Sequence, residues 1–155
     1  IYTILFGTAL ASTLFGIFIS FILVVAGLLL NMIPHDIVLL ILGVSVASLC
    51  YSFMGLLFSA IPSDIPADAV LLSSVVRFPL IFISGVFIPI QRLPYYIRPL
   101  AYISPVTYFS DLIDHIYGHD SLFNPLVDLT VLLILTVAFM VLALIVNEAT
   151  LTRRL

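Results

Sequence analysis

Two long stretches of this sequence, residues 1–30 and 37–61, contain no Asp, Glu, Lys, Arg or His. Thirty helical residues span roughly 45 Å, which exceeds the ~30 Å hydrocarbon core of a bilayer. Only 8% of the 155 residues are charged, whereas soluble domains carry about 25%. Because so little charge is available to cover a surface in contact with water, the sequence predicts an integral membrane protein.

Polar breaks divide the chain into four apolar segments. Pro34 is expected to end the first helix, and Asp36 can cap the N-terminus of the next. We therefore predict an all-α fold, a polytopic helical membrane protein with one transmembrane domain over residues 1–155. The predicted spans lie at about 1–30, 37–61, 69–90 and 126–146.

Residues 91–118, between the last two spans, are rich in proline and half apolar. We predict that they form a re-entrant or interfacial helical hairpin. Ser104 and Pro105 form a favourable helix start, with a hydroxyl N-cap and proline at the first helical position. Gly118 is expected to lie just past the end of this helix, where glycine is common. The expected apolar stripe is Val106, Phe109, Ile113 and Ile116, with Asp111, Asp114 and His115 on the opposite face.

The chain opens on Ile1 within an apolar run, without an initiator methionine or the basic start of a signal peptide. We therefore expect it to be a fragment whose earlier part is missing. Four spans would place both ends on one side of the membrane. The arginines do not orient the protein, because Arg153 and Arg154 near the end balance Arg92 and Arg98 in the hairpin.

Small and hydroxylated residues recur along one face of each of the first two predicted helices. Such residues let membrane helices approach closely and bond across the contact. Plain helix packing is one interpretation, and the lining of a weakly polar translocation path is the other. The two stripes are Thr8, Ser12, Gly16 and Ser20, and Ser45, Ser48, Ser52, Gly55 and Ser59.

Arg77 is the one charged residue that the sequence places well inside a predicted span. An intramembrane charge is costly and often marks function. The side chain can snorkel to the head groups, or it can pair with Glu148 or Asp64 at the ends of neighbouring helices. In the same span, Pro79 and Gly85 predict a kink, which is either static or a hinge.

Asp111, His115 and His119 follow one another at helical spacing and could present metal ligands. A solvated polar face is the ordinary explanation, and we predict no metal site. No motif for covalent chemistry is present, so the chain is predicted not to be an enzyme. The chain has no lysine, which excludes a phosphate-binding P-loop within it and a basic arm for nucleic acid.

One part of the sequence is similar to the membrane subunit of ABC type-2 transporters, which includes drug and polysaccharide exporters. The resemblance is carried by an apolar run that ends in Ser-Gly with a proline after it, by a Leu-Pro pair, and by the stretch Ser104–Tyr108. Ser104 and Asp114 depart from the family pattern, which has Asn and often Arg there. The motif residues are Pro79, Ser84, Gly85, Pro89, Pro94 and Pro105.

This resemblance implies a permease subunit that moves an amphipathic or lipid-like substrate by alternating access. It implies six spans, of which these are the last four, in a multi-pass protein of the cell membrane with both ends cytoplasmic. The implied partners are an ABC ATPase, a second identical or related permease copy, and membrane lipid. No cofactor is expected in this chain, because ATP and Mg²⁺ would be held by the ATPase.

Two other functions stay open at the level of sequence. An ion- or metal-transporting membrane protein could use Asp111, His115 and Arg77 as a polar path. A membrane assembly subunit without transport activity is the other possibility.

Overall fold

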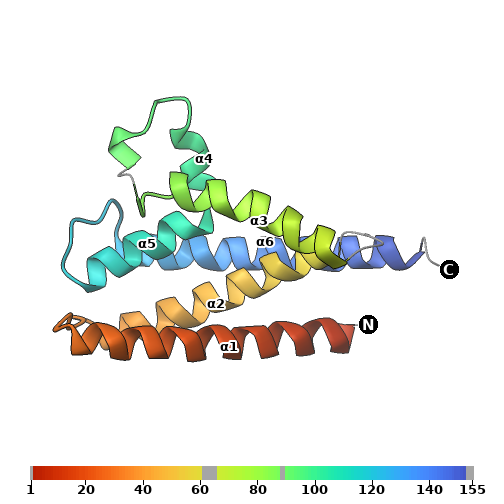
Figure 1. Cartoon of the computed structure of the whole chain (residues 1–155), viewed down its shortest axis with the longest axis horizontal. Coiled ribbons are helices and arrows are strands. Elements are labelled where there is room, and N and C mark those ends of the chain that lie inside the picture. Colours follow the sequence, from red (N-terminus) through yellow and green to blue (C-terminus); the bar gives the residue numbers. More distant parts are fainter. Residues whose placement is uncertain (1, 61–65, 88–89, 153–155) are drawn as a thin grey trace.

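The computed structural model describes residues 2–60, 66–87 and 90–152, and all regular structure in these ranges is helical (Figure 1). The predicted all-α fold is therefore confirmed. The elements are α1 (Tyr2–Leu29), α2 (Ile37–Ser59), α3 (Pro66–Ile83), the 3₁₀ turn η1 (Ile90–Arg92), α4 (Arg98–Ile103), α5 (Pro105–Ile116) and α6 (Pro125–Thr152).

Within the described ranges, three helices are long and apolar enough to cross a bilayer. The qualifying segments are Thr3–Leu29, Ile37–Ser59 and Pro125–Glu148. The third predicted span, residues 69–90, is shorter than expected, because α3 ends at Ile83 and its apolar part covers only Ser73–Ile83. A polytopic membrane protein is supported, and the number of four spans stays a prediction.

Helix α2 lies at the centre of the fold and packs against α1, α5 and α6 (Figure 1). Helix α3 contacts α2 and α4, and α5 lies against α6. The start of α1 and the end of α6 lie at the same end of the molecule, and the α1–α2 loop and the α5–α6 loop lie at the opposite end (Figure 1). We refer to the end with these two loops as the loop end.

The first helix ends at Leu29, close to the predicted boundary at residue 30, but Pro34 is not what ends it. Asn31 has a left-handed backbone (φ 61°), and the N–H of Met32 donates to the carbonyl of Gly27 at 3.0 Å. The N–H of Asn31 donates to Leu28 O, also at 3.0 Å. This pattern is a Schellman motif, so the helix stops at Leu29 before it reaches Pro34.

The predicted helix starts are confirmed. The Asp36 carboxylate accepts a hydrogen bond from Leu39 N at 3.0 Å and caps α2. The Ser104 hydroxyl accepts from Val106 N at 3.3 Å, and Pro105 is the first residue of α5. Gly118 ends α5 with φ 76°, and His119 N donates to Asp114 O at 2.8 Å, so this end is a Schellman motif as well.

The buried face of α5 differs from the predicted stripe. Leu112 and Ile116 are almost fully buried against Leu40 of α2, whereas Val106, Phe109 and Ile113 are only half-buried. Asp111, placed on the solvated face by the sequence, is 5% exposed. The face is rotated because Asp111 binds the loop that follows α5, as described below.

Large apolar side chains cover the outside of the long helices. Leu14, Phe15 and Phe18 of α1 and Ile134 of α6 are among those at least 60% exposed. In water such a surface would be unfavourable by about 25 cal/mol per Å² of apolar area. In a bilayer the same side chains contact lipid, so the outward pattern agrees with a membrane location.

Candidate functional site

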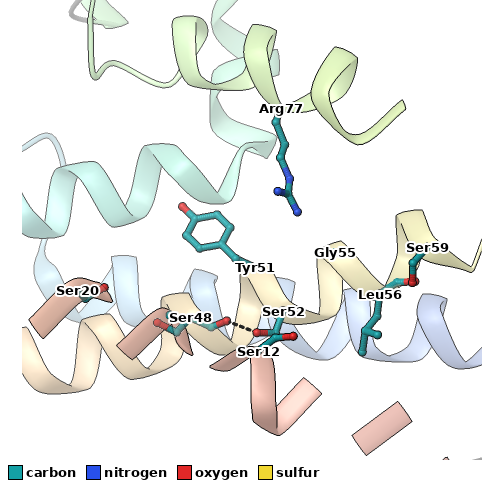
Figure 2. Close-up of a pocket in the computed structure, with 10 residues that line it drawn as sticks. Ser12, Ser20, Ser48, Tyr51, Ser52, Gly55, Leu56, Ser59 and Arg77 are labelled. Atoms are coloured by element: carbon teal, nitrogen blue, oxygen red, sulfur yellow. Dashed lines mark hydrogen bonds between the residues drawn. The ribbon is translucent and has the colours of Figure 1, made fainter. Parts of the chain in front are cut away.

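A polar groove of about 460 Å³ lies among α1, α2 and α3 (Figure 2). We refer to it as the polar groove. Most of its lining side chains carry a hydroxyl, which is unusual on helices that are otherwise this apolar. Ser12, Gly16 and Ser20 come from α1, Arg77 comes from α3, and Ser48, Tyr51, Ser52, Gly55, Leu56 and Ser59 come from α2.

The two small-residue stripes meet where α1 crosses α2, beside the polar groove. A Cβ atom placed on Gly16 would lie 3.1 Å from Ser48 Oγ. The Thr13 hydroxyl donates to Ser52 Oγ at 3.1 Å, and Ser52 in turn donates to the carbonyl of Ser48 at 2.8 Å. These contacts bring the helices close in the way that small and hydroxylated residues allow in membranes.

The structure therefore brings together most, but not all, of the predicted stripe. Ser45 donates to Ile41 O at 2.7 Å and lines a different, apolar groove. Thr8 bonds the backbone of its own helix and does not line the polar groove. Tyr51 and Leu56 were missed, because they fall between the small residues that defined the pattern.

Arg77 extends from α3 across the groove toward α2 (Figure 2). A Cβ atom placed on Gly55 would lie 3.4 Å from Arg77 Nη2, so the guanidinium lies next to the glycine backbone. Arg77 is 11 residues beyond the start of α3, which corresponds to roughly 16 Å along the helix. Its pairing with Glu148 stays a prediction, and Asp64 lies outside the described residues.

The family-motif residues mark the end of α3 and the start of α5. Pro79 lies inside α3 without ending it, and Pro94 is exposed in the segment that precedes α4. Ser84 is 1% exposed and donates to Ile81 O at 2.7 Å, and Gly85 turns the chain with φ 98°. Pro89 lies outside the described residues. That Pro79 and Gly85 act as a hinge stays a prediction.

Asp111 closes the loop after α5 and is not available as a solvated ligand. Its two carboxylate oxygens accept hydrogen bonds from Leu122 N at 2.6 Å and from Phe123 N at 2.8 Å. His115 lies 3.3 Å from Ser121 Oγ, and His119 is past the end of the helix. No group of three His, Cys, Asp or Glu side chains in the described part of the chain is placed to hold a metal.

A second, smaller cavity of about 150 Å³ lies beside Asp111. Ser84, Gly85, Asp114 and Asp120 are among its lining residues. Burial raises the pKa of Asp114, His119 lowers it by a smaller amount, and the negative charge of Asp111 raises it further. Because Asp111 and Arg77 line separate cavities, the geometry does not favour one polar path through both.

Asp128 in the first turn of α6 was missed by the sequence reasoning. It is fully buried, and among the described residues neither of its carboxylate oxygens has a hydrogen-bond donor. The carboxyl group of Asp111 interacts with it. An acidic residue within an apolar span is a signal in itself, but Asp128 lies near the start of its predicted span and was missed for that reason.

Comparison with known proteins identifies the family. The family described as "ABC-2 type transporter" matches residues 1–117 of the 155. This chain belongs to the ABC-2 type transporter family. Comparisons with curated proteins and with solved structures found no match.

Membership in the ABC-2 family makes the chain a membrane-embedded transport subunit of an ABC transporter, and not itself the catalytic one. Proteins of the ABC-2 family generally work with an ABC ATPase. The matched range includes α1 to α5, and with them every residue that lines the polar groove. The predicted resemblance is therefore confirmed.

Proposed function

We propose that this chain is the passage-forming part of an ATP-driven exporter for an amphipathic or lipid-like substrate. The observation that carries the proposal is the polar groove, which interrupts an otherwise apolar helix surface. A groove of hydroxyls and one cation can solvate the polar part of an amphipath. The surrounding apolar side chains, such as Phe15 and Phe18, can contact its hydrocarbon part.

The driving energy would come from a partner ATPase, which would hold ATP and Mg²⁺. The absence of lysine from this chain supports this division of roles, because a P-loop uses a lysine on the nucleotide phosphates. Closure of the ATPases would tilt the helices and expose the groove alternately to the two sides of the membrane. The close contact of Gly16 with Ser48 would keep α1 and α2 together during this movement.

A second permease copy would complete the passage. The exposed apolar faces of α1 and α6 offer surface for lipid and for such a copy. We propose a cell-membrane location in which the loop end faces outward and both ends of the chain face the cytoplasm.

The test is transport by the intact complex in proteoliposomes. The protein would be reconstituted with its ATPase, and ATP-dependent movement of a fluorescently labelled phospholipid between leaflets would be measured. Gly55→Leu is expected to fill the polar groove and displace Arg77, because among the described side chains only Arg77 lies within 4 Å of a Cβ atom at Gly55. We expect at least a tenfold loss of the transport rate with assembly retained.

The matched control is Gly7→Leu on α1, since no atom of another described part of the chain lies within 4 Å of a Cβ atom at Gly7. This variant should transport at the normal rate. Equal transport by the two variants would contradict a passage through the polar groove. Failure of the unaltered complex to move any amphipath with ATP would contradict the exporter function itself.

A further inference from the structure

Arg77 brings a positive charge, its guanidinium, into the polar groove. Among the described residues that line this groove there is no carboxylate. A cation placed at membrane depth is costly unless an anion or water compensates it, with insertion scales giving at least ~2.5 kcal/mol at a helix centre. The described lining residues supply no such anion, so the groove can accept an acidic group next to Arg77.

The polar groove also adjoins a place for a hydrocarbon chain. An apolar groove of about 250 Å³ lies between α1 and α2, nearer the loop end. Ile17, Phe21, Val24 and Ile41 are among its lining residues, and Ser20 lines both grooves. A polar, positively charged compartment thus continues into an apolar one along the same pair of helices.

We infer that the two grooves together bind an anionic amphipath, with its phosphate or carboxylate group on Arg77 and its hydrocarbon tail in the apolar groove. This inference rests on the proposed transport function and names the substrate class for it. A free anion would use only the first compartment, and a neutral or cationic lipid would leave Arg77 uncompensated. The arrangement of both grooves around Ser20 fits a molecule that has both parts.

The local geometry suits an acidic group. The guanidinium offers a planar fork of N–H donors, which matches the oxygens of a phosphate or carboxylate. It lies over Gly55, where the lack of a side chain leaves the groove open. The side chain of Tyr51 lines the same groove.

The experiment measures binding of dodecyl phosphate to the purified protein in neutral detergent, with native mass spectrometry to count the bound molecules. Arg77→Gln removes the charge, and Arg77→Lys restores it. Arg92→Gln, which removes an exposed arginine in the turn η1, is the matched control. Inorganic phosphate and dodecyltrimethylammonium serve as the anion without a tail and the tail with the opposite charge.

We expect Arg77→Gln to raise the Kd for dodecyl phosphate at least tenfold, which corresponds to ~1.4 kcal/mol. Arg77→Lys should lose less affinity than Arg77→Gln, because lysine keeps the charge and lacks only the planar fork of donors. Arg92→Gln should stay within about twofold of the unaltered protein. Dodecanol should bind equally to all variants, which verifies that Arg77→Gln retains its fold and its apolar groove.

Two results would overturn the inference. One is equal affinity of the unaltered protein and Arg77→Gln for dodecyl phosphate. The other is binding of inorganic phosphate, or of dodecyltrimethylammonium, as tight as that of dodecyl phosphate, which would assign the site to a free anion or to the tail alone.

The transport assay separates this inference from the proposed function. Arg77-dependent binding without ATP-driven movement of any amphipath would retain the site and reject the exporter function. ATP-driven transport with no preference for anionic over cationic amphipaths would retain the exporter and reject the anionic site.

Discussion

The side chain of Leu112 in α5 fills the space above Gly43 of α2, so closely that a methyl group on Gly43 would overlap the Leu112 Cδ2 atom. Leu112 is fully buried and belongs to the cluster that joins α5 to α2. Helix α5 is therefore held against α2 by a leucine that packs over a glycine.

Gly43→Ala should destabilise the protein. Overpacking of this kind costs ~1–3 kcal/mol, which outweighs the ~0.5–1 kcal/mol that alanine gains over glycine within a helix. Thermal unfolding in detergent measures the effect, and Gly7→Ala, at an open position of α1, should be neutral or stabilising. The double variant Gly43→Ala with Leu112→Ala should lose less stability than the sum of the losses in the two single variants. Strictly additive losses would contradict a direct contact between the two residues.

Asp128→Asn should leave the thermal midpoint unchanged or raise it. Asp128 is fully buried and has no donor on either oxygen, whereas an amide in its place can donate to the Asp111 carboxyl group. Asp111→Asn should lower stability by ~1–3 kcal/mol. An amide has one oxygen in place of two, so either the Leu122 N–H or the Phe123 N–H loses its acceptor. If Asp128→Asn and Asp111→Asn lowered the stability by similar amounts, the result would contradict the difference between an Asp128 without donors and an Asp111 with two.

Gly85→Ala should destabilise the end of α3. The backbone at Gly85 has φ 98°, which costs a residue with a Cβ ~1–2 kcal/mol. The new methyl group would also lie 3.2 Å from Ile90 Cγ1. Unfolding in detergent, with Gly7→Ala as the reference, measures the loss. A Gly85→Ala variant as stable as that reference would exclude strain at this turn.

Because of Asp114, the stability of the protein should fall as the pH rises above about 4, which is the ordinary pKa of an aspartate. Burial is the largest cause that raises its pKa, so the folded state binds more protons than the unfolded state in this window. By linkage, the carboxyl group stabilises the fold at low pH and this contribution is lost as the pH increases through the raised pKa.

Asp114→Asn should therefore flatten the dependence of the thermal midpoint on pH and raise the midpoint at neutral pH. The control is Asp120→Asn, which removes an exposed carboxylate from the same cavity. An unchanged pH profile in Asp114→Asn would contradict the assignment.

The features that the sequence predicted correctly depend on neighbours along the chain. Charge-free runs indicated the long helices, and the caps at Asp36 and Ser104 need only the N–H groups two or three residues away. The buried face of α5 depends instead on Leu122 and Phe123, which bond Asp111 from a loop 11 and 12 residues further on. Helical periodicity contains no information about such a contact.

The candidate site shows the same division. The stripe Ser48, Ser52, Gly55 and Ser59 was visible at helical spacing, and the structure places it in one groove. The approach of Arg77 to Gly55 could not be predicted, because it depends on how α3 crosses α2. The buried position of Asp128 depends likewise on the packing of α5 against α6.

At the loop end, His35 N donates to Ile116 O at 2.9 Å and fastens the α1–α2 loop to the end of α5. Ser59 lies at the far end of α2, 22 residues from Ile37, which is about 33 Å. A helix fixed at one end acts as a lever, and a tilt of about 10° over that length moves its free end by about 6 Å. Small rotations at this joint would therefore change the width of the polar groove most at Ser59, at the end of α2 where the proposed ATPase would act.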